Sequence, residues 1–163
     1  MKRWWWLWAG LALSAVLVAL ALRGTPEGDV RTIVQEASSA TEAGVNRRDL
    51  SAVEPFFATP AEGANLAGLG QTIGQLRMFT THLSPSDQVQ VHSFQIQSVA
   101  VHESGGLARA TYRLHVSVVR GGAAVYTAVM TQNLALLKTP RGWRISGGDQ
   151  PQLSDVVGAW PPR

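Results

Sequence analysis

The first 23 residues constrain this chain more than any other part of it, because residues 4–22 carry no formal charge. As an α-helix, these 19 residues would span roughly 28 Å, close to the thickness of a bilayer's hydrocarbon core. Four of the five residues at the start of this run, residues 4–8, are tryptophans, which favour the membrane–water interface. Lys2 and Arg3 precede the run and should keep the N-terminus in the cytoplasm. We therefore expect residues 1–23 to be a single-pass anchor in the cell membrane, with the rest of the chain outside the cytoplasm.

A cleaved signal peptide is the alternative for the same segment. It has a basic start, an apolar stretch and a small-x-small tripeptide at residues 19–21. No helix breaker precedes this tripeptide, and the run is longer than a usual signal core, which favours a retained anchor. Both alternatives export the domain, which would be secreted if cleavage occurs.

The composition argues against a nucleic-acid partner. Lys2, Arg3 and Arg23 account for the formal net charge of +3, so from residue 24 onward 11 basic side chains balance 11 acidic ones. The exported part thus lacks the net positive charge that drives phosphate binding. The chain has no cysteine, which excludes disulfides, thiolate nucleophiles and cysteine-ligated zinc. An exported domain without disulfides fits many bacterial cell-surface proteins.

The pattern after the anchor begins with helical periodicity. Residues 24–28 contain glycine and proline and are expected to be a linker. Apolar residues at a spacing of about 3.6 then predict helices over residues 29–44, 50–57 and 65–82.

From residue 88 the period becomes two, which is typical of strands. The alternation predicts strands over residues 88–101, 107–120, 125–138 and 143–145. It slips near residues 92–93 and 97–98, where we expect bulges in a long bent strand. Residues 150–163 contain three prolines and are expected to be an irregular tail.

Three helices followed by an antiparallel meander predict an α+β fold, with the helices on one face of a curved sheet of about four strands. Two stretches carry a family resemblance: NRRDLSAVEPFFA at residues 46–58 and NLALLKTPRGWRI at residues 133–145. The first resembles the helix-turn-helix entry of the nuclear transport factor 2-like superfamily, the fold of polyketide cyclases and ketosteroid isomerases. The second is similar to its last hairpin. The resemblance covers residues 29–149 and implies a cone-shaped domain with a cavity on the concave side of the sheet.

Strand alternation places a mixed group of aromatic, apolar and polar residues on that concave face. They are Tyr112, Tyr126, Met130, Gln132 and Trp143. Hydroxyl and amide groups in an apolar wall are features of a small-ligand site. An ordinary core whose tyrosines reach its rim is the alternative.

The sequence offers little evidence of a catalytic site or a metal site. Enzymes of this superfamily use a pocket Asp or His as general base, with donors for the developing oxyanion. Residues 104–148 contain no acidic side chain, and the four histidines stand at least ten residues apart, without the close pairs typical of zinc sites. We therefore expect no catalytic residue, no metal and no cofactor.

The opposite face of the sheet is expected to carry a polar strip. Its members are Arg109, Thr111, Arg113, His115 and Thr131. Because arginines can form bidentate hydrogen bonds with carboxylates, we expect this strip to contact a second copy of the chain or an envelope protein.

The sequence thus predicts a membrane-anchored, extracytoplasmic binding or assembly module without catalytic activity. Two alternatives stay open. One is a bitopic scaffold subunit, because the layout is similar to that of scaffold subunits in conjugation and type IV secretion machines. The other is a small-molecule-binding isomerase, dehydratase or cyclase.

Overall fold

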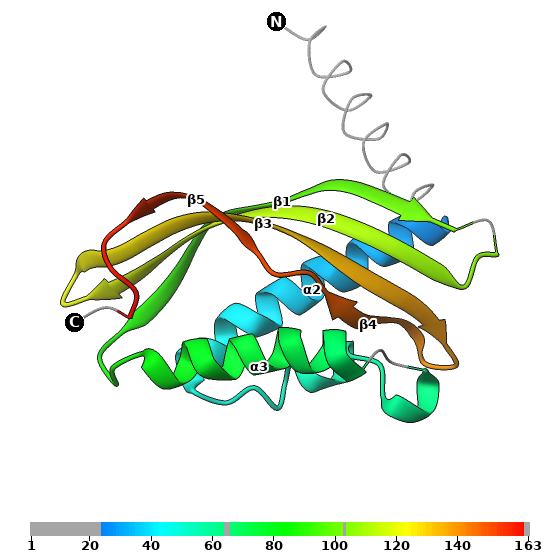
Figure 1. The fold of residues 1–163 in the computed structure, drawn as a ribbon, viewed down its shortest axis with the longest axis horizontal. Coiled ribbons are helices and arrows are strands. Elements are labelled where there is room, and N and C mark those ends of the chain that lie inside the picture. The colour runs from blue at the N-terminus through cyan, green and yellow to red at the C-terminus, as the bar shows by residue number, and fades with distance from the viewer. Residues whose placement is uncertain (1–23, 64–65, 103, 162–163) are drawn as a thin grey trace, which may run out of the picture.

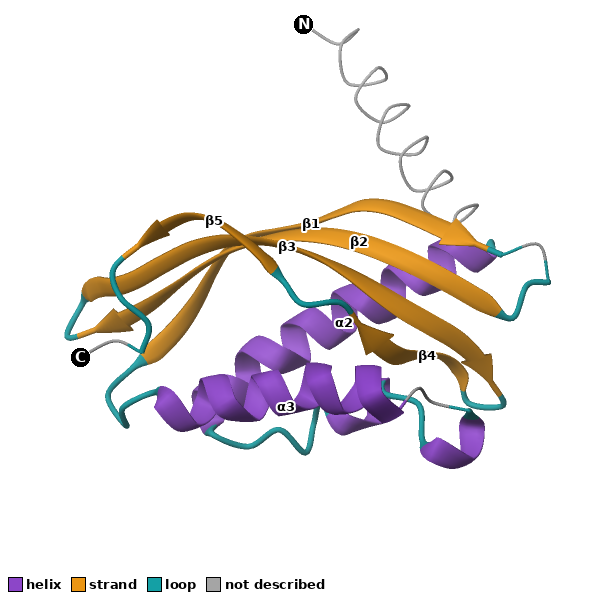
Figure 2. Ribbon diagram, viewed as in Figure 1, coloured by secondary structure: helices purple, strands orange, loops and turns teal. Residues whose placement is uncertain are grey.

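The computed structural model describes residues 24–63, 66–102 and 104–161. Within these ranges, two helices lie under one curved antiparallel sheet of five strands (Figures 1 and 2). The predicted α+β class is confirmed, although the sequence predicted three helices and about four strands. No helix in these ranges is long and apolar enough to cross a membrane. The expected anchor or signal peptide, residues 1–23, lies outside the described residues.

Helix α2 (Pro26–Arg47) includes most of the expected linker, residues 24–28. The Oγ1 atom of Thr25 caps it by accepting a hydrogen bond from the Gly28 N–H at 3.1 Å. Pro26 suits the first helical position, where its missing N–H is not needed. The chain is therefore helical almost from the beginning of the described part.

The predicted helix over residues 50–57 is wrong. The chain forms only a short 3₁₀ turn, η1 (Glu54–Phe56), after which Phe57 is extended and makes a parallel β-bridge with Ile145. The Ala58 N–H donates to the Ile145 carbonyl oxygen at 2.9 Å. Because the backbone of Phe57 and Ala58 pairs with Ile145 of the sheet, the helical turn cannot continue. A second turn, η2 (Pro60–Glu62), follows.

Helix α3 (Leu66–His82) matches the predicted third helix within one residue. It lies beside strand β4 and turns Leu76 and Phe79 toward the interior.

Most of the sheet follows the sequence prediction. The strands are β1 (Gln88–Val101), β2 (Leu107–Arg120), β3 (Ala123–Thr139), β4 (Gly142–Gly148) and β5 (Gln152–Val157). The first four pair in chain order. The two predicted bulges in β1 are confirmed, because the register with β2 shifts at His92 and again at Gln97.

Strand β5 corrects the prediction that residues 150–163 are irregular. Strand β4 pairs only with the second half of β3, from Leu134 onward. The free edge of β3 before that point is taken by β5, in a register that runs from Thr127 to Thr131. The prolines that suggested irregularity lie outside the strand, so they do not interrupt its hydrogen bonds.

Side chains of α2 occupy the outer edge of β1. The Asn46 amide donates to the Val89 carbonyl oxygen at 2.9 Å and accepts from the Val89 N–H at 2.7 Å. The Glu42 Oε1 atom accepts from the Val91 N–H at 3.2 Å. These bonds fix the helix against the sheet and satisfy backbone groups that an edge strand otherwise leaves open.

Two apolar clusters fill the space between the helices and the sheet. The first cluster surrounds Leu136 and Trp143, and the second surrounds Val118 and Tyr126. Burying each large aliphatic side chain stabilises the fold by roughly 1.5–3 kcal/mol. Leu50 packs against both clusters, and residues of both line the candidate site.

Candidate functional site

A cavity of about 220 Å³ lies under the concave face of the sheet. Val34 and Leu134 line it from the first cluster, and Val45 and Val116 line it from the second. Most of its wall is hydrophobic. The polar side chains that line it are Ser38, Thr41, Glu42, Gln75, Tyr112 and Gln132.

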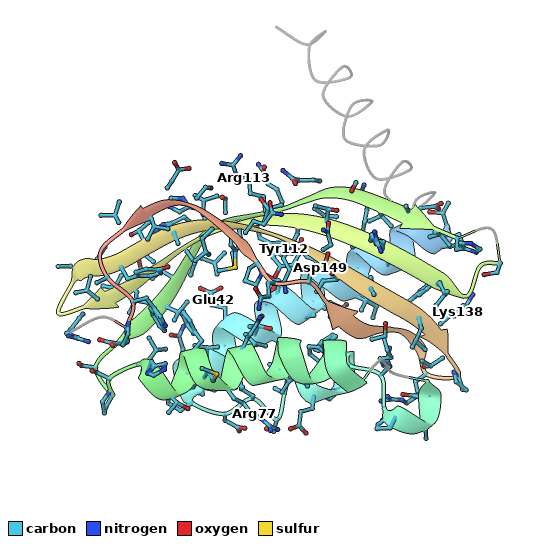
Figure 3. The ribbon with its side chains drawn as sticks, viewed as in Figure 1. Glu42, Arg77, Tyr112, Arg113, Lys138 and Asp149 are labelled. Atoms are coloured by element: carbon cyan, nitrogen blue, oxygen red, sulfur yellow. The ribbon has the colours of Figure 1, made fainter. Side chains whose placement is uncertain are left out.

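Tyr112 and Gln132 form a hydrogen-bonded pair on the cavity wall. The register places them opposite each other on β2 and β3, and the Tyr112 hydroxyl donates to Oε1 of Gln132 at 2.5 Å. The Gln132 amide donates in turn to the carbonyl oxygen of Asp149 at 2.6 Å, where the chain passes from β4 to β5. Figure 3 shows Tyr112 and Asp149 close together beneath the sheet. Burial raises the pKa of Tyr112 to about 12, so the folded domain holds the phenol proton more tightly than water holds that of an exposed tyrosine.

The structure brings three of the five predicted pocket residues to the cavity. Tyr112, Met130 and Gln132 line it, whereas Tyr126 and Trp143 do not. Tyr126 packs in the second cluster, where burial raises its pKa. Trp143 packs in the first cluster. Both side chains are buried in the interior as predicted, but they pack within the clusters and do not line the cavity.

Sequence reasoning missed Glu42, which reaches the cavity from α2. Val34 and Ala37 are apolar residues of the helix predicted over residues 29–44, and both line the cavity. Glu42 lies one turn after Ser38, another lining residue, so the spacing of about 3.6 residues per turn was the available signal. Figure 3 shows Glu42 between α2 and the sheet.

The C-terminal segment packs beside the cavity. The Trp160 ring stacks on Phe79 of α3 at a centroid distance of 4.6 Å, and its edge meets Tyr126 of β3 at 5.2 Å. Pro151 also lines the cavity. Because Phe79 is a lining residue, the segment after β4 helps to hold the cavity wall in place.

The predicted polar strip lies on the face of the sheet that points away from the helices. Figure 3 shows Arg113 on this side and Tyr112 on the other. Arg109 and Arg113 are exposed. Arg113 is paired in register with Thr131, and its guanidinium lies 3.9 Å from the Asp155 carboxylate, an exposed pair of little energetic weight. Thr111 donates to the Asn133 side chain at 2.7 Å. Contact of this strip with a partner stays a prediction.

A small hydrogen-bonded group continues the strip. Ser117 is buried, and its hydroxyl lies 2.8 Å from both the His92 Nε2 and the Thr127 hydroxyl. The His115 ring lies 4.6 Å from the His92 ring, between centroids. In the described part of the chain, no three His, Asp or Glu side chains come together as a metal would require.

Comparison with known proteins gives information on the fold. No protein-family model and no curated protein matches the chain. Among solved structures, a protein named as a dehydratase of the nuclear transport factor 2-like family, from Streptomyces avermitilis, is similar, with 19% identity and a TM-score of 0.52, over 76% of this chain and 95% of that one.

Two further structures are similar at the same level. A protein named as an aromatic ring hydroxylase, from Novosphingobium aromaticivorans, has 21% identity and a TM-score of 0.51 over 79% of this chain and 92% of that one. The intermembrane space region of the chloroplast protein ARC6 has 12% identity and a TM-score of 0.50, over 82% of this chain and 97% of that one. At these identities the likeness concerns the fold alone, and that fold is nuclear transport factor 2-like.

Proposed function

We propose that this protein is a non-catalytic binding module that takes a small, mainly apolar ligand into the cavity beneath its sheet. The observation that carries the proposal is the cavity of about 220 Å³, lined by both apolar clusters. A concave, mostly hydrophobic site with a few fixed polar groups is the usual form of a small-molecule site.

The hydrogen bonds of Tyr112 and Gln132 support binding over catalysis. The Tyr112 hydroxyl is engaged by Gln132, and the Gln132 amide is engaged by the backbone of Asp149. A donor for a developing oxyanion must point at the reacting atom. Here the hydroxyl proton of Tyr112 points at a neighbouring side chain and fixes the shape of the wall.

We propose further that an anchor at residues 4–22 holds the domain outside the cytoplasm. Its apolar length and its basic flank support this topology. The intact mass of the membrane-bound chain tests it. A retained anchor gives the full chain in membranes, whereas a soluble product beginning near Leu22 would mean a cleaved signal peptide.

Ligand binding is tested with a neutral probe, 4-phenyl-1-butanol, dialysed against the full chain in lipid nanodiscs. Empty nanodiscs measure partition into the lipid. Ser38→Leu places a larger side chain on the cavity wall, whereas Ser39→Leu makes the same change at an exposed position of the same helix.

We expect the wild type and Ser39→Leu to bind the probe above the level of empty discs, and Ser38→Leu to lose most of that binding. Equal binding by the two variants would show that the probe is held somewhere other than the cavity.

A further inference from the structure

The cavity wall carries one kind of charge. Glu42 is acidic, and the described lining residues include no Lys, Arg or His. Within the described residues, none of the ion pairs involves Glu42. Its Oε1 atom accepts a hydrogen bond from the Val91 N–H, which holds the carboxylate between α2 and the sheet (Figure 3).

The rest of the wall suits a positively charged apolar ligand. Aromatic rings line the cavity, and the face of such a ring attracts a cation within about 6 Å. They belong to Phe57, Phe79, Phe94 and Tyr112. The Glu42 side chain is half-buried, so it attracts a cation more strongly than a fully solvated carboxylate does. An anionic ligand would meet a like charge, and a neutral ligand would leave the carboxylate without a counter-ion.

We infer that the cavity selects an organic cation, namely a protonated amine on a small aromatic or aliphatic body. The ammonium group donates hydrogen bonds to the Glu42 carboxylate, and the apolar body lies against the aromatic rings. This inference rests on the proposed function, since it names the ligand class of the same cavity.

The test compares 4-phenylbutylamine with 4-phenyl-1-butanol, which share an apolar body and differ in charge. Both are dialysed against the full chain in phosphatidylcholine nanodiscs, with empty discs as the lipid background. We expect the wild type to bind the amine about tenfold more tightly than the alcohol, as a charge-assisted hydrogen bond implies.

Two matched variants isolate the carboxylate. Glu42→Gln should lose the preference for the amine, because it removes the charge while glutamine retains the oxygen that accepts from Val91. Glu36→Gln makes the same charge change at an exposed position of α2 and should keep the preference.

The outcomes separate this inference from the function on which it rests. Equal binding of the amine and the alcohol by the wild type would overturn the inference, as would a preference that survives in Glu42→Gln. In both cases the proposed function stands. If neither probe binds above the level of empty discs, both proposals fail.

Discussion

At the scale of single residues, the cavity depends on polar atoms that satisfy one another. The Tyr112 hydroxyl and the Gln132 amide lie on neighbouring strands, and each would be costly to bury alone. Together with the Asp149 carbonyl oxygen they form a short chain of hydrogen bonds. This chain lets polar groups remain in a mostly hydrophobic wall without losing stability.

Removing one member of this chain should be measurable. Tyr112→Phe leaves the Gln132 Oε1 atom without its donor, so we expect a loss of about 1–3 kcal/mol in the free energy of unfolding. Tyr126→Phe removes the chain's other tyrosine hydroxyl, which makes no hydrogen bond within the residues that the structure describes, and should cost less. Chemical denaturation of the two variants near neutral pH makes the comparison, and an equal loss would contradict it.

The same residue predicts how stability changes in alkali. The pKa of Tyr112 is raised from 10.0 to about 12 by burial, so the folded state holds this proton more tightly than the unfolded state. The resulting stability is fully present below pH 10.0 and is lost as the pH rises toward about 12. Tyr112→Phe should show a smaller decline over this range in denaturant titrations. A decline equal to that of the wild type would mean that other groups cause it.

Some of the cavity residues could be identified from the sequence, for physical reasons. A strand alternates strictly, so Tyr112, Met130 and Gln132 could be assigned to one face. The same rule could not say which inward residues line a cavity and which fill a core, so Tyr126 and Trp143 were assigned to the pocket although they pack in the core. Glu42 is harder to find, because a polar residue at the edge of a helical face is usually solvated.

At the scale of elements, the sequence predicted strands better than short helices. Strand β2 has the predicted limits, because a turn bounds it at each end. The stretch at residues 50–57 has helical spacing, but pairing of Phe57 with the sheet overrides it. Strand β5 could not be predicted from its own residues. It forms because β3 is longer than β4 and leaves a free edge, which is a property of the assembled sheet.

The end of β5 depends on one glycine. Gly158 has a positive φ of 89°, and a Cβ atom there would lie 2.4 Å from the Val125 carbonyl oxygen. Gly158→Ala should therefore push the tail away from β3 and speed amide exchange in β5. Gly105→Ala is the control, since its φ of 68° carries similar strain but a Cβ atom would meet nothing within 4 Å.

The two variants should differ in which part of the domain they destabilise. Gly105→Ala is expected to lower global stability by about 1 kcal/mol and to leave exchange in β5 unchanged. If Gly158→Ala protects the β5 amides as well as Gly105→Ala does, the close approach is not what holds the tail.

At the scale of the whole molecule, one buried aspartate links β2 through its carboxylate and the end of α2 through its backbone carbonyl. Asp87 lies between α3 and β1, is 2% exposed, and accepts hydrogen bonds from Arg120 of β2 at 2.6 and 3.0 Å. It also accepts from the Ser84 N–H at 2.8 Å. Arg48, at the end of α2, donates to the carbonyl oxygens of Ser84 and Asp87 at 2.7 and 2.9 Å. The helices and the sheet are thus tied together at one end of the domain.

This junction should contribute to the response of the domain to acid. Hydrogen bonds from Arg120 hold the pKa of Asp87 below its ordinary value of 3.8, against the opposing effect of burial. A depressed carboxyl pKa gives stability that is present above the ordinary pKa value and is lost as the pH falls below that value.

Asp87→Asn should therefore lower stability at neutral pH and flatten the loss of stability below about pH 4. Asp29→Asn, at an exposed position in the first turn of α2, should keep the acid sensitivity of the wild type. Unfolding midpoints measured from neutral to acid pH make the comparison, and parallel curves for all three proteins would mean that the acid response arises at other carboxylates.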